Sequence, residues 1–317
     1  MTEAPLEFSE EDIQHMLENL DSFSSDEVAE IDRIVDELAV REQNELAFED
    51  LIEFCKRMQP DYIVGKHHRI LAGMLMSIER GDKDRICVNI PPRHGKSQLV
   101  SIYFPAWFLG RNPNKKVMMV SHTTDLAVDF GRKVRNLIST DEYSSIFPTV
   151  SLAADSKSAG RWNTSMGGEY YACGIGSSIA GRGADLLLVD DPHSEQDVIN
   201  GNFEVFEKAY EWFTFGARTR LMPGGRVAII QTRWHMDDLT GRVTKDMVQN
   251  DRSDQYEVVE FPAILDTANK KGKPVQKPLW PEFFDLEALL RTKASMPAFQ
   301  WNAQYQQEPT AEEAALV

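Results

Sequence analysis

The segment VNIPPRHGKSQLVS, residues 88–101, has residues of the types and spacing that could bind a phosphate group. Gly95, Lys96 and Ser97 match the end of the pattern Gly-x-x-x-x-Gly-Lys-Ser, while Ile90 replaces its first glycine. In such a loop the lysine neutralises the β and γ phosphates of a nucleotide, and the serine hydroxyl binds Mg²⁺. The two prolines after Ile90 can fix a conformation that the missing glycine would otherwise permit.

The flanking sequence predicts a strand before this loop and a helix after it. The buried-type run ICVNI ends where the loop begins, and the apolar, helix-like run QLVSIYFPAWFL follows it. This order aims backbone N–H groups and a helix N-terminus at a phosphate. We therefore expect a nucleotide to contact Pro92, Arg93, His94, Gly95, Lys96, Ser97 and Gln98. Arg93 would lie near the γ-phosphate, either stabilising charge there or bracing the loop.

A pair of carboxylates follows a second apolar run, LLLVDD, about 95 residues downstream of the loop. Asp190 would hold Mg²⁺, directly or through water, and Asp191 would orient the attacking water. Glu195 remains a rival for the water-orienting role, and two adjacent acids after a strand can also cap a helix. Together with the loop, these acids indicate nucleotide hydrolysis.

A third apolar run ends in IIQTRWH, where Gln231 and Thr232 could sense the γ-phosphate or the attacking water. His235, Asp237 and Asp238 follow, but one imidazole and two neighbouring acids make a poor metal-ligand set. We therefore expect a structural role for these three residues.

These candidate residues need a sheet to bring them together. Apolar or β-branched runs at residues 85–90, 116–121, 170–175, 186–191, 226–232 and 256–262 alternate with helical stretches. Several are apolar at consecutive positions, which is typical of strands covered on both faces. The pattern predicts an α/β fold with a mainly parallel sheet flanked by helices, over residues 59–262. Residues 263–317 form a C-terminal lid or linker segment, in which NKKGKPVQKPLWPEFF is expected to be loop and DLEALLRTKA a helix.

The net charge of −16 is concentrated in the N-terminal segment, residues 1–58. Residues 1–50 hold 17 acidic and 2 basic residues, while the remainder holds 33 acidic and 32 basic ones. Two helices are expected here, SEEDIQHMLENL and a second that begins with a capping box at Ser24 and Glu27. Packing of the second helix on the main domain is favoured over a docking arm for a partner.

Composition excludes several other classes of protein. No apolar stretch is long enough to span a bilayer, and the N-terminus does not resemble a secretory signal, so we expect a cytosolic protein without a membrane partner. Cys55, Cys87 and Cys173 are odd in number and far apart, so they indicate buried small residues rather than a disulfide framework or a zinc site.

Taken together, the motifs PPRHGKS, GIGSSIAGRGADLLLVDDPHS, RVAIIQTRWHMDDLTGR and WNAQYQQEP resemble the ATPase domain of the large terminase subunit of tailed bacteriophages. The resemblance covers about residues 60–310. It implies a RecA-like P-loop ATPase of the additional-strand catalytic type, with Lys96 and Ser97 as the Walker A pair. Asp190 and Asp191 would be the Walker B acids, and Gln231 and Thr232 the coupling motif.

The resemblance also places two arginines and two histidines in the site. Arg182, in AGRG, matches an arginine that can reach a neighbour's ATP as a finger, and Arg93 matches a loop arginine that acts in cis or in trans. His67 or His68 occupies the place of the adenine-binding segment.

The implied machine is a motor that drives double-stranded viral DNA into a procapsid, in the cytoplasm of the infected bacterial host. Its implied partners are the portal protein, the small terminase subunit and further copies of itself, as a ring of five. Family members continue into a nuclease domain, so we expect no cleavage activity from these residues. A helicase and a nucleotide-gated DNA-binding scaffold are the alternatives, and NKKGK and the arginines of FGARTR are candidate DNA contacts.

Overall fold

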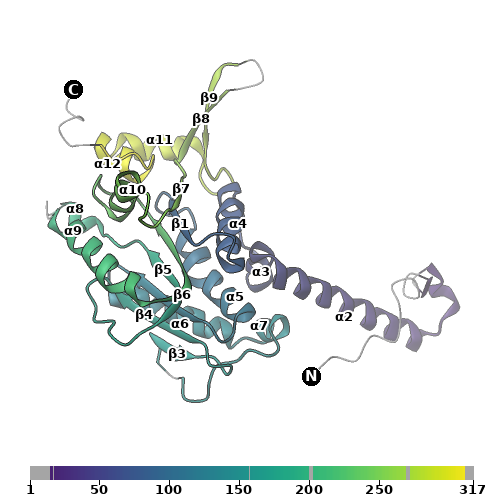
Figure 1. Cartoon of the computed structure of the whole chain (residues 1–317). Helices are drawn as coiled ribbons and strands as arrows, with labels where there is room; N and C mark the ends of the chain where they lie inside the picture. The colour runs from purple at the N-terminus through teal and green to yellow at the C-terminus, as the bar shows by residue number, and fades with distance from the viewer. Residues whose placement is uncertain (1–14, 17, 157, 200–202, 269–271, 311–317) are drawn as a thin grey trace.

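The computed structural model describes residues 15–16, 18–156, 158–199, 203–268 and 272–310 (Figure 1). Its centre is a seven-stranded sheet in the order β3-β4-β2-β5-β6-β1-β7. All neighbours pair in parallel except β3 and β4, which are antiparallel. The strands are β1 (Arg85–Asn89), β2 (Lys116–Ser121), β3 (Arg161–Asn163), β4 (Glu169–Gly174), β5 (Ala184–Asp190), β6 (Leu221–Gln231) and β7 (Glu257–Glu260).

Helices cover both faces of this sheet, as the consecutive apolar residues of its strands require. In β5, Leu186 and Leu188 belong to one apolar cluster, while Leu187 and Val189 belong to another on the opposite face. The first face is covered by α3 (Leu51–Met58), α4 (Lys66–Arg80), α5 (Phe104–Arg111), α6 (Thr124–Ile138) and α7 (Asp141–Ile146), and by the π-helix η2 (Gln98–Tyr103). The second is covered by α9 (Glu204–Glu211), the π-helix η3 (Trp212–Ala217) and α10 (Leu239–Gln249), with α8 (Glu195–Ile199) and the 3₁₀ helix η4 (Arg218–Arg220) on the connecting segments.

All six strands expected from the sequence are present, and three further strands are not among them. The stretch expected to be loop after residue 268 contains β9 (Pro274–Pro278), so that expectation is wrong there. β9 pairs antiparallel with β8 (Ile264–Ala268) in a separate two-stranded sheet. Its terminal prolines and single apolar residue hide the strand pattern, but proline is tolerated at the end of an edge strand. The C-terminal segment also contains α11 (Leu286–Ala294) and α12 (Ala298–Gln304).

The acidic N-terminal region is helical and largely exposed. The capping box of Ser24 and Glu27 is confirmed, and the helix that it begins, α2 (Ser25–Glu49), is 25 residues long. Figure 1 shows α2 pointing away from the sheet, and only its last turns reach the main body, where Trp107 donates to Ala47 O at 3.1 Å. The expected packing on the main domain therefore holds only for the end of α2. Most of the first expected helix lies outside the described residues, apart from its end beside the 3₁₀ turn η1 (Leu20–Ser22).

The three cysteines and the helix α3 belong to the main body of the chain. Cys55, Cys87 and Cys173 are free and buried, as expected. The side chains of α3 lie in the same apolar cluster as the strands, so this helix is packed as part of the main body although the sequence assigned it to the N-terminal segment. Across the described ranges, every helix is too short or too polar to cross a bilayer.

Candidate nucleotide-binding site

The loop from Ile90 to Gly95 joins β1 to a helix that begins at Lys96 and continues as η2, so Lys96 and Ser97 lie at a helix N-terminus. Ile90 continues the ladder between β1 and β6, since its N–H donates to Gln231 O at 3.0 Å. The left-handed turns fall instead at Arg93 (φ 64°) and Gly95 (φ 78°). A Cβ atom at Gly95 would lie 2.3 Å from Nε2 of His68, so only glycine fits there. This explains why the first glycine of the common pattern is not needed.

Lys96 is the buried cation of the site. Its Nζ lies 2.7 Å from Oδ2 of Asp191, and the Lys96 side chain is only 8% exposed. Burial disfavours the charged ammonium, but Asp191 and Asp190 outweigh this effect and raise the pKa of Lys96. Lys96 therefore stays charged and is held next to the two carboxylates at the end of β5, Asp190 and Asp191.

Asp190 is buried and only partly satisfied. Its Oδ2 accepts from the Ser101 hydroxyl at 2.6 Å, while Oδ1 is buried with no hydrogen-bond partner within the described chain. Burial, and then the charge of Asp191, raise the pKa of Asp190 to about 6, although Lys96, Ser101 and Ser97 pull it down. An unpaired carboxylate oxygen beside a serine hydroxyl suits a hard cation that prefers oxygen ligands. Ser97 also lowers the pKa of Asp190, so Asp190 and Ser97 together could hold Mg²⁺.

Ser101 is a polar partner that the sequence did not single out. It lies four residues after Ser97, one helical turn along η2, and it is fully buried. A serine inside an apolar helical run was the available signal, because a buried hydroxyl needs a partner.

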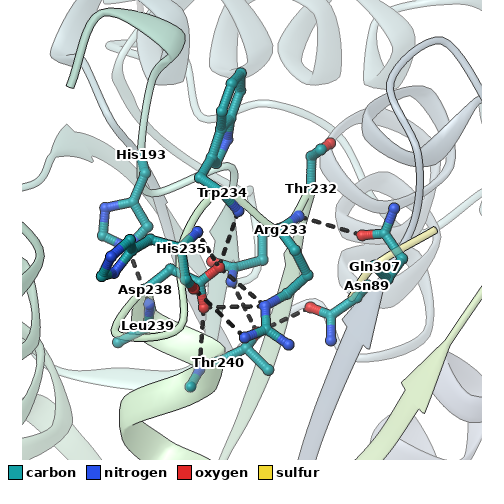
Figure 2. A network of polar contacts seen from close by, with 12 residues as sticks. Asn89, His193, Thr232, Arg233, Trp234, His235, Asp238, Leu239, Thr240 and Gln307 are labelled. Atoms are coloured by element: carbon teal, nitrogen blue, oxygen red, sulfur yellow. Dashed lines mark hydrogen bonds and ion pairs between the residues drawn. The ribbon is translucent and has the colours of Figure 1, made fainter. Parts of the chain in front are cut away.

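The end of β6 connects the loop to Asp191. The Thr232 N–H donates to Oδ1 of Asp191 at 2.8 Å, and the Thr232 hydroxyl donates to Ile90 O at 3.1 Å. Gln231 points the other way, into the interior, where its Nε2 donates to the Thr240 hydroxyl at 2.8 Å. That hydroxyl in turn donates to Oδ1 of Asn89 at 2.8 Å (Figure 2). Thr232 thus contacts Asp191 and the loop, whereas the Gln231 side chain is hydrogen-bonded in the interior.

The segment after Thr232 is held by a buried ion pair. Asp238 is fully buried, caps α10 by accepting from Gly241 N–H at 3.0 Å, and lies 2.9 Å from Nε of Arg233 (Figure 2). His235 stacks on Phe206 with 5.1 Å between ring centroids. Across the described residues, no three His, Cys, Asp or Glu side chains are grouped to hold a metal. Asp238 and His235 thus have structural contacts, and the structural interpretation of the His235, Asp237 and Asp238 group stays a prediction.

The buried side chains of His67 and His68 hold the loop by hydrogen bonds to its backbone. Nε2 of His67 and Nε2 of His68 each lie 3.0 Å from His94 O, which can only accept. His68 Nδ1 accepts from Gly65 N–H at 3.0 Å, so the proton of a neutral ring is on Nε2. Burial lowers the pKa of His68 to about 3 and that of His94 to about 4, which keeps both rings neutral.

The family described as "Terminase large subunit, T4likevirus-type, N-terminal" matches residues 87–301, which include the loop, both acids and the end of β6. The chain belongs to this family. A comparison with curated proteins found no match.

Among solved structures, the large terminase of bacteriophage HK97 is similar with a TM-score of 0.51 at 13% identity, over 82% of this chain and 55% of that one. The ATPase domain of the Thermus phage P74-26 large terminase has a TM-score of 0.45 at 16% identity, over 74% and 92% of the two chains. The large terminase of a thermophilic bacteriophage, in complex with ADP, has a TM-score of 0.43 at 11% identity, over 73% and 52%. The likeness to the HK97 protein shows a shared fold, and this terminase-family chain spans about half the length of that protein.

Other predicted site residues lie around this terminase-family centre or away from it. Arg93 is exposed and has no polar partner in the part of the chain described. Glu195 is exposed in the first turn of α8, and Gln98 donates to Gln59 Oε1 at 2.7 Å. His67 is fully buried on the loop carbonyl, so its adenine-binding role stays a prediction.

Arg182 lies at the other end of the parallel strands, just before the residue where β5 begins. Its guanidinium is 3.3 Å from Glu169, the first residue of β4, and lies 4.6 Å from the centroid of the Tyr171 ring. β5 runs from Ala184, just after Arg182, to Asp190, a length of about 20 Å at the usual rise per residue. Within one copy, Arg182 and the Asp190 carboxylate are therefore separated by the length of a strand.

Proposed function

We propose that this chain hydrolyses ATP to ADP and phosphate, and that hydrolysis drives double-stranded viral DNA through the portal into a procapsid, in the cytoplasm of the infected host. Membership of the terminase family supports the packaging role. The observation that carries the hydrolytic role is the contact of Lys96 with Asp191, the neighbour in sequence of Asp190, which has an unpaired buried oxygen.

The proposed reaction uses these residues in sequence. Lys96 leaves Asp191 for the β and γ phosphates when ATP binds, which frees the Asp191 carboxylate to accept a hydrogen bond from water. The water oxygen then bonds to the γ-phosphorus, the bond from the γ-phosphorus to the β–γ bridging oxygen breaks, and the water proton passes to solvent by way of Asp191. Mg²⁺, held by Ser97 and Asp190, would supply neutralising charge on the phosphates. Asp191 is favoured over Glu195 because it already contacts Lys96 and Thr232, whereas Glu195 is exposed.

We further propose that the complete site forms between copies in a ring, with the portal and the small terminase subunit as partners. Arg182 is too far from the Asp190 of its own copy to contact the same nucleotide, so it would act on a neighbour's ATP. Arg93 is on the loop itself and would act in cis. Head-to-tail association of identical copies closes into a ring when its rotation allows.

Replacing Lys96 tests the proposed hydrolysis. Lys96→Ala should lower steady-state phosphate release from ATP by at least about 100-fold, because the charge that develops on the phosphates loses its fixed partner. Lys208→Ala, on the exposed surface of α9, is the matched control and should retain wild-type turnover. Circular dichroism would verify that both variants are folded. Unchanged turnover in folded Lys96→Ala would rule the site out.

A further inference from the structure

Within the described chain, three residues other than glycine have a positive φ. They are Arg93 (64°), Asp191 (44°) and Gln307 (62°). The left-handed region is unfavourable for residues with a Cβ, and such strain persists only where the surroundings hold it. Two of the three belong to the candidate nucleotide site. The third lies in the C-terminal segment, far away in sequence and without an assigned role.

The Gln307 side chain is connected to the same site through Arg233. It is 1% exposed, and its Oε1 accepts from the Arg233 N–H at 3.2 Å (Figure 2). Arg233 directly follows Thr232, whose own N–H holds Oδ1 of Asp191 at 2.8 Å. Two consecutive backbone N–H groups at the end of β6 are therefore fixed by two residues with strained backbones.

The segment that carries Gln307 is firmly anchored. Ala263 N–H donates to Tyr305 O at 2.6 Å, while Gln306 both accepts from Ile264 N–H at 3.2 Å and donates to Ile264 O at 3.1 Å. Gln307 thus offers its acceptor from a fixed position.

Arg233 is fixed on its other side as well. Its guanidinium contacts Asp238 at 2.9 Å and Glu260 at 3.1 Å, so the side chain cannot follow a displaced backbone without breaking ion pairs. These contacts on one side, and the hydrogen bond from the Thr232 hydroxyl to Ile90 O on the other, fix the position of Thr232.

We propose that Gln307 is a positioning residue for ATP hydrolysis. By accepting the Arg233 N–H, it fixes the end of β6 and so keeps Thr232 in place to orient the Asp191 carboxylate. The proposal rests on the ATPase activity proposed above. It also joins the C-terminal segment to the end of β6 through the hydrogen bond from Arg233 N–H to Gln307.

Two substitutions of similar size separate the acceptor from the packing. Gln307→Glu keeps an acceptor oxygen at the same reach, while Gln307→Met fills the same space without one. We expect Gln307→Met to lower kcat for ATP by about 10-fold or more with KM within about twofold, since misplacement of a catalytic group acts on the chemical step. Gln307→Glu should stay within about threefold of the wild type.

A third variant covers the case in which Gln307→Met does not fold. Gln307→Asn tolerates the left-handed conformation but withdraws its oxygen from the Arg233 N–H, and it should show the same selective loss of kcat. Wild-type kcat in folded Gln307→Met or Gln307→Asn would overturn the proposal, as would an equal loss in Gln307→Glu. Absence of turnover in the wild-type chain would instead contradict the ATPase function itself.

Discussion

At the scale of single residues, the positive charge of Lys96 only partly neutralises the two carboxylates of the site. Lys96 lies against Asp191, and burial of Asp190 next to Asp191 leaves one oxygen of Asp190 without a partner. Two adjacent acids and one lysine leave a net negative charge in a buried place, which is costly unless a proton or a cation is present. The same arrangement that would bind Mg²⁺ therefore makes this part of the chain sensitive to pH in the absence of Mg²⁺.

The raised pKa of Asp190, about 6, gives the sign of that sensitivity. Between the ordinary pKa of aspartate and this value, the folded chain keeps a proton that the unfolded chain has released. The resulting stabilisation is present at low pH and is lost as pH rises through about 6. Without Mg²⁺ or nucleotide, wild type should lose on the order of 1 kcal/mol more unfolding free energy than Asp190→Asn between about pH 5 and pH 8.

Urea unfolding of both proteins at the two pH values measures this difference. Buried histidines such as His68 also titrate, but they contribute equally to both proteins and cancel. The same loss in the wild type and in Asp190→Asn would show that Asp190 ionises normally.

The sequence predicted the residues with a short motif and missed those whose roles depend on distant contacts. Lys96, Asp190, Asp191 and Thr232 come together because three parallel strands end at one edge of the sheet. Gln307 is brought to Arg233 only by the packing of the C-terminal segment, and no local pattern reveals such a contact. The φ of Arg93 was equally hidden, since arginine does not mark a left-handed turn as glycine does.

At the scale of elements, the sheet was predictable because strands covered on both faces are apolar at consecutive positions. The β8–β9 hairpin lacks that signal because only one of its strand residues is buried, and β3 lacks it because it has only three residues, of which one is buried. The helix α2 is the converse case, since its amphipathic pattern predicted a helix correctly but not where its apolar stripe would pack. Up to residue 40, Ile31 is the only buried side chain among those described.

Removal of residues 1–40 should therefore leave the main body almost as stable as before. Ala47 and the α3 residues that pack in the core are retained, so we expect the melting temperature of the main transition to change by less than about 2 °C. Differential scanning calorimetry of the full and shortened chains measures this. A large drop would show that the acidic arm stabilises the body.

At the scale of the whole molecule, the two ends of the parallel strands have different roles in the proposed ring. The carboxyl ends carry the loop, the acids and Thr232, whereas Arg182 lies at the amino ends, paired with Glu169. A head-to-tail ring places these unlike ends against each other, so each nucleotide would contact residues of two copies. This arrangement makes hydrolysis a property of the interface rather than of one copy.

Mixing two inactive variants tests this account most directly. Arg182→Ala and Asp191→Ala should each release little phosphate from ATP when assembled alone. In an equal mixture, about a quarter of head-to-tail interfaces join an intact arginine to an intact Asp191 site, so phosphate release should return at a corresponding fraction of the wild-type rate. No release at any mixing ratio, with an active wild type measured in parallel, would contradict a shared site.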